Sequence, residues 1–386
     1  MSNKSKREYL KKVIERYFKA DREEKKRILD EFCANCGYNR KYAIRLLNQQ
    51  RKTQTKSKRR GPKVIYDGLV TNVLHIIWKT SGYLCSRRLK AAIALYLPSY
   101  KIEHSLSEDT EQKLLKISHQ TIDRKLKPFR LSLKRRRFCT TRPGTLLKHQ
   151  IPIKTDNWDV TKPGFLECDT VVHCGDSLVG DYIYSVGGVD ILTGWTEYRA
   201  VWNKGQQGVL SAIKDIEGAL PFPLLGFDSD NGGEFLNYHL YRYCEMRSPH
   251  KRVQFTRSRP YKKDDNAHIE QKNWTHVRQL IGYTRLDNPQ VVGQLNDLYK
   301  GEWNWFNNYY CPSMKLISKK RVGSRIVKVY DSPKTPCQRV LECSDVVPET
   351  KERLSALFSS LNPFQLNAII EQKVADILDN ARLPKL

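Results

Sequence analysis

Long apolar stretches are missing from this 386-residue sequence, in which no uncharged run approaches the roughly 18–20 residues that cross a bilayer. Dense cysteine frameworks are missing too, because the ten cysteines are scattered singly and not grouped as in small secreted domains. There is no phosphate-binding loop of the form GxxxxGKS or GxxxxGKT, so we expect no use of ATP. These absences favour a protein of the reducing cell interior that does not act in a membrane.

The only close cysteine pair is Cys33 and Cys36, and the nearest histidine, His75, lies far downstream. A structural zinc site needs a second pair of ligands, so buried helix cysteines are the favoured interpretation. The first ten residues, MSNKSKREYL, are basic and polar, which predicts no secretory signal and a cytoplasmic location.

Positive charge is concentrated in the first part of the chain. The sequence has 68 Lys and Arg against 41 Asp and Glu, a net charge of +27. Residues 1–150 hold 38 basic and 13 acidic side chains, a net +25, which leaves +2 for residues 151–386. Such a field favours a polyanionic partner, because each Lys or Arg beside a phosphate releases condensed counterions. We therefore expect DNA as a partner.

Residues 1–50 are predicted to form a helix-turn-helix DNA-binding domain. Apolar residues recur at helical spacing over 7–19 and 22–36, and Gly37 can end the second helix in a left-handed conformation. A third helix at 39–50 would enter the DNA groove. Its expected packing residues are Ile44, Leu46 and Leu47, and its expected DNA contacts are Arg40, Lys41 and Arg45.

A basic linker, 51–63, and a second helical DNA-binding domain, 64–137, follow. In the linker, Arg59 and Arg60 either enter an A·T-rich minor groove or belong to a solvated tether. The second domain is expected to hold a helix at 86–97 that is stopped by Pro98. A recognition helix should follow, capped by Ser118 and ending near Pro128, with Arg124 and Lys125 facing DNA.

After a linker at 138–163 the pattern changes to alternating strands and helices. Three strands rich in Val, Ile, Tyr and Trp come first, at 164–174, 181–192 and 195–202. The predicted order then runs through a helix at 206–220, a strand at 224–230, a helix at 233–247, a strand at 253–258 and a long helix from about 265. This order predicts an α/β fold, a mixed sheet flanked by helices.

Three acids stand out in this region. Asp169 lies among apolar residues in mid-strand, where a carboxylate needs a cation, a metal or hydrogen bonds. Asp230 follows an apolar strand, but Asp228 shares its strand face, so spacing alone does not choose between them. On the last helix, Glu270 is expected on a buried stripe with Trp274, Val277 and Ile281. Three inward carboxylates of this kind can hold two Mg²⁺ ions for displacement at phosphorus.

The motifs CDT, DNGGEF and RPYKKDDNAHIEQKNWTHVRQ resemble those of the DDE group, the retroviral integrases and bacterial insertion-sequence transposases. The likeness covers 164–311, with 60 residues between Asp169 and Asp230 and 39 between Asp230 and Glu270, the second gap being slightly longer than usual. It implies an RNase H-like integrase catalytic domain in which Asp169, Asp230 and Glu270 hold Mg²⁺ or Mn²⁺, two ions in all. Asp228 then becomes a neighbour of the ligands.

The sequence departs from this family in two places. The His/Cys zinc domain of retroviral integrases is absent, and Asn266, Ala267 and His268 replace the usual small residues before the glutamate. His268 either assists proton transfer, touches phosphate or is a plain surface residue. Lys262 and Lys263 either hold DNA phosphates or belong to a solvated loop.

Residues 312–386 are expected to form a basic β element, around 318–328, and two C-terminal amphipathic helices that pack or mediate assembly. The aromatic run 302–310 either packs in the core or stacks on bases.

The resemblance implies a bacterial transposase, associated with the nucleoid, that cleaves the 3′ ends of a mobile element and transfers them into target DNA. Two ends must be joined, so a homo-oligomer is expected. Two alternatives are a structure-selective nuclease of the same fold and a transposase-derived DNA-binding regulator.

Overall fold

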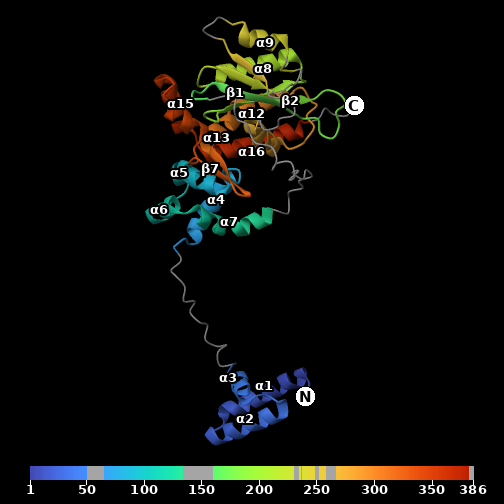
Figure 1. Ribbon diagram of the computed structural model, residues 1–386, viewed down its shortest axis with the longest axis vertical. Helices are drawn as coiled ribbons and strands as arrows, with labels where there is room; N and C mark the ends of the chain where they lie inside the picture. Colours follow the sequence, from blue (N-terminus) through green and yellow to red (C-terminus); the bar gives the residue numbers. More distant parts are fainter. Residues whose placement is uncertain are drawn as a thin grey trace. The chain divides into compact units, whose positions relative to one another are not determined.

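The computed structural model describes residues 1–49, 65–133, 160–229, 234–235, 237–247, 252–257 and 267–381 (Figure 1). It divides the chain into two compact units, Met1–Ile65 and Tyr66–Leu386. None of the described helices combines the length and the apolar character that crossing a bilayer would require.

The first unit is a bundle of three helices, α1 (Asn3–Lys19), α2 (Arg22–Cys36) and α3 (Arg40–Gln49). Gly37 ends α2 with φ 65°, and its N–H donates to the Cys33 carbonyl at 2.8 Å, which confirms the predicted helix end. Cys36 packs in the apolar core between the helices.

The expected packing face of α3 was partly wrong. Ala43 and Leu47, four residues apart, form the buried stripe, which turns Ile44 outward with 37% of its surface exposed. Ile44 therefore lies on the same exposed side as Lys41 and Arg45.

The second unit begins with four helices, α4 (Gly68–Thr80), α5 (Ser86–Glu103), α6 (Glu108–Lys116) and α7 (His119–Leu133). Ser118 caps α7 as predicted, because its Oγ accepts the N–H of Thr121 at 3.2 Å.

The two expected proline stops were wrong. Helix α5 continues through Pro98 to Glu103, because Tyr96, Leu97 and Tyr100 pack into the core on either side of it. Helix α7 continues through Pro128, beyond which Phe129 stacks on His75 with ring centroids 3.9 Å apart. Burial of flanking side chains thus outweighs the lost backbone hydrogen bond.

A five-stranded mixed sheet forms the centre of the second unit. Its strands are β1 (Phe165–Val172), β2 (Ile183–Asp190), β3 (Thr196–Trp202), β4 (Gly226–Ser229) and β5 (Gln254–Arg257), in the order β3-β2-β1-β4-β5. The first three strands pair antiparallel, while β4 and β5 join β1 in parallel. This is the RNase H-like α/β sheet that the sequence predicted.

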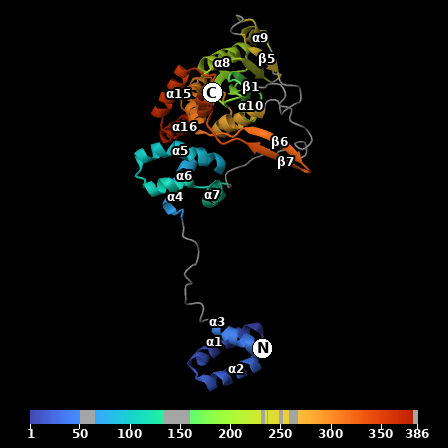
Figure 2. The ribbon, with the colours of Figure 1, turned by 60° about the vertical axis from the view of Figure 1, so that its left-hand side comes forward.

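Helices cover both faces of the sheet (Figures 1 and 2). On one side lie α8 (Gln206–Ala219) and α9 (Tyr238–Glu245). On the other lie α10 (Ala267–Lys272), a π-helix (Asn273–Arg278), α11 (Gln279–Ile281), α12 (Val291–Lys300) and α13 (Glu302–Tyr310). Phe306, Tyr309 and Tyr310 of α13 are buried, so the aromatic run 302–310 belongs to the core.

The C-terminal part adds a hairpin and three helices. The hairpin consists of β6 (Leu316–Val322) and β7 (Arg325–Tyr330), and α14 (Pro336–Glu342), α15 (Pro348–Ser360) and α16 (Pro363–Asp379) follow. The two expected amphipathic helices are α15 and α16. Phe364, at the start of α16, meets the ring of Tyr96 from α5 edge to face, with centroids 5.9 Å apart, so this helix packs within the second unit.

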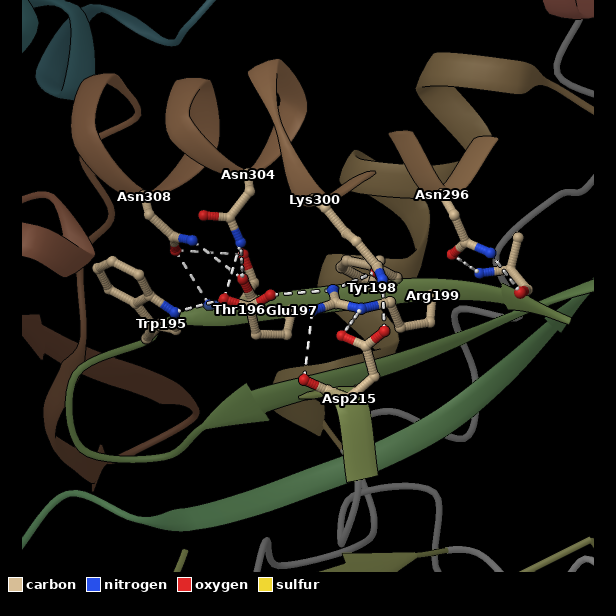
Figure 3. Close-up of polar contacts among 11 residues, drawn as sticks. Trp195, Thr196, Glu197, Tyr198, Arg199, Asp215, Asn296, Lys300, Asn304 and Asn308 are labelled. Atoms are coloured by element: carbon tan, nitrogen blue, oxygen red, sulfur yellow. Dashed lines mark hydrogen bonds and ion pairs between the residues drawn. The ribbon is translucent and has the colours of Figure 1, made fainter. Parts of the chain in front are cut away.

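Asparagine side chains cover the free edge of β3 (Figure 3). Asn308 accepts the N–H of Thr196 at 3.0 Å and donates to its carbonyl at 2.9 Å, and Asn296 does the same for Ala200 at 2.8 and 2.9 Å. Each side-chain amide thus replaces one residue of a missing neighbouring strand, and the edge is closed to other chains.

Charged side chains fasten the same strand to the helices on both sides of the sheet (Figure 3). Buried Arg199 bonds Glu197 at 3.0 Å and Asp215 of α8 at 3.0 Å, and Lys300 of α12 also pairs with Asp215. Every member of this group has a partner, which buried charges require.

We predict that Asn308→Ala lowers the free energy of unfolding by about 1–3 kcal/mol, because the buried N–H of Thr196 loses its acceptor. Urea denaturation of the full chain measures the loss. The control is Asn367→Ala, which removes an exposed contact to Glu371 and should change stability by less than about 0.5 kcal/mol. Equal losses in both variants would contradict the assigned role of Asn308.

Candidate active site

Strand β1 presents two acids, Glu167 and Asp169, on the face that the α10 segment covers. They are two residues apart, so strand alternation directs both to the same side. Asp169 is half-buried, and each of its oxygens accepts a hydrogen bond. Oδ1 accepts from the backbone N–H of Thr170 at 2.7 Å and Oδ2 from Nδ2 of Asn273 at 2.8 Å. The hydrogen-bond partners that a mid-strand carboxylate requires are therefore present.

Asn273 orients Asp169 and is itself held from the sheet. Its side chain is buried, and its Oδ1 accepts the hydroxyl of Tyr198 at 3.2 Å. Burial raises the pKa of Tyr198 well above its usual value, so this hydroxyl stays protonated and remains a donor. The chain of contacts Tyr198–Asn273–Asp169 fixes one rotamer of the carboxylate.

Gly187 makes room for this chain of contacts. It lies directly opposite Asp169 in β1 and opposite Tyr198 in β3. A Cβ at this position would lie 2.3 Å from the ring of Tyr198, closer than any side chain can approach. The tyrosine ring therefore lies over the glycine and reaches Asn273.

Glu167 fixes the helix that carries Glu270. Its side chain is only 5% exposed, and its Oε2 accepts the backbone N–H groups of His268 and Ile269 at 3.0 and 3.2 Å. These are first-turn N–H groups of α10, which have no partner within the helix. A carboxylate from the sheet thus caps α10 and sets its position against β1.

Glu270 lies in the first turn of α10 with its side chain exposed, so the expectation that it lies on the buried stripe was wrong. Trp274 is also 44% exposed, whereas Val277 and Ile281 are buried as expected. The π-helix explains the difference, because its wider turn displaces the stripe by one residue. The buried positions before Val277 are accordingly Ile269 and Asn273.

Two further residues that the sequence singled out, Asp228 and His268, lie near Glu167. Asp228 is half-buried in β4, in register with Glu167, and its Oδ1 accepts the hydroxyl of Thr256 at 2.6 Å. His268, the second residue of α10, has an exposed side chain, and its backbone N–H donates to Glu167. Arg59, Arg60, Asp230, Lys262 and Lys263 lie outside the described residues.

The basic residues assigned to DNA fall into two groups. Lys41 and Arg45 are exposed on α3, with the Arg45 guanidinium 5.1 Å from the ring centre of Tyr42, and Arg40 pairs with Asp30. On α7, Arg124 is exposed and contacts Thr121 at 3.0 Å. Lys125 instead donates to the carbonyl of Tyr66, so it ties α7 to the start of the second unit.

The oxygen donors of Asp169 and Glu270 suit a hard divalent cation such as Mg²⁺ or Mn²⁺. Glu270 precedes Asn273, the residue that holds Asp169, by three residues, which is one helical turn. Within the described part of the chain, no three His, Cys, Asp or Glu side chains lie close enough together to hold a metal ion.

Sequence reasoning missed Glu167, Asn273 and Tyr198. Strand alternation gave a signal for Glu167, since it shares the face of Asp169. No sequence pattern indicated Asn273, because the π-helix, which helical spacing alone does not predict, is what places this residue on the buried stripe.

No family model matches the sequence. The uncharacterized protein y4rM of Sinorhizobium fredii (strain NBRC 101917 / NGR234) is 36% identical over 335 residues, which cover 86% of this chain and 94% of that protein. The sequences are thus alike along most of both chains.

Three solved structures are also similar to parts of this chain. The catalytic core domain of BIV integrase matches 46% of this chain and 94% of its own, at 15% identity and a TM-score of 0.28. The HTLV-2 integrase core in complex with magnesium matches 39% and 90%, at 15% identity and a TM-score of 0.28. A chain of the simian T-cell lymphotropic virus intasome in complex with PP2A regulatory subunit B56 gamma matches 55% and 68%, at 13% identity and a TM-score of 0.32.

We predict that Glu167→Ala speeds amide exchange at the start of α10 about 10- to 100-fold, because two N–H groups lose a charged acceptor. Hydrogen-exchange mass spectrometry of peptides spanning residues 267–272 measures the change. Glu167→Gln keeps an acceptor oxygen and should retain much of the protection. Unchanged exchange in the alanine variant would show that Glu167 does not cap this helix.

Proposed function

The chain belongs to the same family as protein y4rM of Sinorhizobium fredii, and we propose that it is a DNA transposase with an integrase-type active site. It would bind the ends of a mobile element, cleave their 3′ ends and transfer them into target DNA. The observation that carries this proposal is the hydrogen bond that Asn273 donates to Asp169 of β1, on an RNase H-like sheet, with Glu270 one helical turn before Asn273.

The register of the sheet supports the third acid. Ser229, the last residue of β4, is paired with Cys168, the residue before Asp169. Asp230 directly follows Ser229 in the sequence. We therefore assign Asp169, Asp230 and Glu270 as the ligands of one or two Mg²⁺ or Mn²⁺ ions, with Asp228 beside them.

Such ions, when bound, stabilise charge on a phosphoryl oxygen and lower the pKa of a bound water. The chain supplies the fixed geometry. Asn273 holds the carboxylate of Asp169, and Glu167 holds the helix that carries Glu270, so this carboxylate and this helix are positioned before DNA arrives. Lys262 and Lys263 would hold DNA phosphates beside the acids, and His268 would contact phosphate from the start of α10.

The reaction consists of two phosphoryl transfers. Water first attacks the phosphorus at each end of the element, and the bond from phosphorus to the 3′ oxygen breaks to leave a free 3′-hydroxyl. That hydroxyl then attacks a target phosphodiester and displaces the 3′ oxygen of the target strand. No covalent bond to the protein forms in either step. Because two ends react together, we propose a homo-oligomer as the working form.

The first unit would select the element ends. Helix α3 follows α2 after a three-residue turn and exposes Lys41, Ile44 and Arg45 on one side. Cations and an apolar residue on the exposed face of such a helix suit phosphates and base edges in the major groove. We assign Arg59 and Arg60 to the adjoining minor groove.

A strand-transfer assay tests the proposal. The full chain, Mg²⁺, a labelled duplex with the DNA ends that flank its gene and a plasmid target are incubated beside the Glu270→Gln variant. We expect joined products from the unmodified chain alone and equal DNA binding by both proteins, because the change removes a charge at the metal site. Cleavage without joining would favour a nuclease, and binding with neither would favour a regulator. Loss of binding in the variant would contradict the role given to Glu270.

Asn273 gives a second prediction for the same assay. Asn273→Ala should lower cleavage about 10- to 100-fold and raise the Mg²⁺ concentration for half-maximal rate, because Asp169 loses the donor that orients it. DNA affinity should not change. Gln271→Ala, a change at an exposed position two residues earlier in the same helical segment, is the control. An unaltered Mg²⁺ dependence in the Asn273 variant would mean that this contact does not position Asp169.

A further inference from the structure

The β6–β7 hairpin is a two-stranded ribbon that projects from the second unit (Figure 2). All its residues except Ser318 are exposed, and no third strand joins it among the described residues. An isolated two-stranded hairpin with no covered face is at best marginally stable in water. Something outside the described chain is therefore expected to contact it.

The ribbon carries charge of one sign. Residues 316–330 contain five cations, Lys319, Lys320, Arg321, Arg325 and Lys328, and no acid. Lys319 lies directly opposite Lys328, a like-charge pair that destabilises a hairpin on its own. No ion pair joins these five side chains to any residue that the structure describes. A polyanion would remove this repulsion.

Both faces of the ribbon combine cations with apolar side chains. By strand alternation, Lys319, Arg321 and Lys328 share one face with Ile326 and Tyr330. The opposite face holds Lys320 and Arg325, with the valines 322, 327 and 329. A ribbon with this composition on both faces suits a groove that encloses it from both sides.

A groove of about 420 Å³ lies between the ribbon and the helices, and its one acidic lining residue, Asp331, is paired with Arg339. Arg87 and Lys90 of α5 and His119 of α7 line one side, and Lys328 and Tyr330 line the other. Arg87 and Lys90 are exposed and three residues apart, so they share one side of α5. The groove therefore offers cations from two separate elements to one ligand.

The base of the ribbon is fixed to the rest of the unit. Arg88 donates to the carbonyl of Pro312, and Lys315 donates to the carbonyls of Ile191 and Leu192. Arg339 pairs with Asp331 at 2.6 Å, directly after β7. The ribbon thus keeps one direction relative to α5, and its cations are presented as a preformed surface.

We propose that the β6–β7 hairpin is a DNA-binding ribbon, which lies in the major groove of a duplex while Arg87 and Lys90 hold the adjacent phosphate backbone. The major groove admits a two-stranded ribbon, and apolar side chains can contact thymine methyl groups there. The proposal rests on the proposed function in taking DNA as the polyanion. A second copy of the chain fits less well, because it would bring two ribbons of charge +5 together.

The test compares two variants of the full chain with equal charge. Lys319→Gln/Arg321→Gln/Lys328→Gln removes three cations from one face of the ribbon and also removes its like-charge pair, so the hairpin should not be weakened. Lys204→Gln/Lys351→Gln/Arg353→Gln removes three cations after β3 and on α15, away from the groove. The probe is a fluorescein-labelled 30-bp duplex of arbitrary sequence, titrated in EDTA over a range of KCl concentrations.

We expect the ribbon variant to bind about 10- to 100-fold more weakly at 0.1 M salt, with the slope of log affinity against log salt reduced by about 2.7 for three lost phosphate contacts. The control variant should bind within about twofold of the unmodified chain. Equal affinities for the two variants, or no binding of this duplex by the unmodified chain, would overturn the proposal.

Light scattering on the same samples distinguishes the other occupant. A ribbon variant that loses a subunit contact but binds DNA like the control would make the ribbon an interface between copies and overturn the proposal. Because EDTA excludes strand transfer, a failed ribbon leaves the catalytic proposal standing, and an inactive enzyme leaves the ribbon standing.

Discussion

The structure of the candidate site depends on two hydrogen-bonded links between β1 and the helical segment 267–281. Glu167 caps the first turn of α10, and about one turn later Asn273 donates a hydrogen bond to Asp169. Helix N–H groups without an acceptor and a half-buried carboxylate without a donor both cost free energy, so each link stabilises the folded segment. The segment that carries Glu270 is therefore tied to the strand that carries Asp169 at two points.

The rest of the sheet supports this arrangement from the opposite edge. Tyr198 reaches Asn273 from β3, and β3 is itself held by the amides of Asn296 and Asn308 and by the ion pairs of Arg199. Backbone N–H and C=O groups at the free edge of β3 are thus hydrogen-bonded by asparagine side chains, which on most helices face water. Polar groups in the core, and not apolar packing alone, transmit the position of α12 and α13 to the site.

Much of the fold could be predicted, because strand alternation, Gly37 and Ser118 act through local geometry that sequence displays directly. The stops at Pro98 and Pro128 and the packing of Ile44 were wrong, since tertiary contacts decide them. The hydrogen bonds of Asp169 could be expected from the cost of a mid-strand charge. The donor Asn273 could not, because its position depends on a π-helix that no local sequence pattern indicates. The catalytic and DNA-binding roles assigned to the acids and the basic residues stay predictions.

The π-helix at 273–278 shifts by one position the residues of the helical segment that face the core. One residue in an α-helix corresponds to about 100° of rotation and 1.5 Å of rise. Residues after the turn, such as Val277 and Ile281, stay in the core, while those before it are rotated relative to an uninterrupted α-helix. The orientation of Glu270 is therefore set by the length of one turn, and a single insertion or deletion there would redirect the acid with the core contacts of Val277 and Ile281 intact.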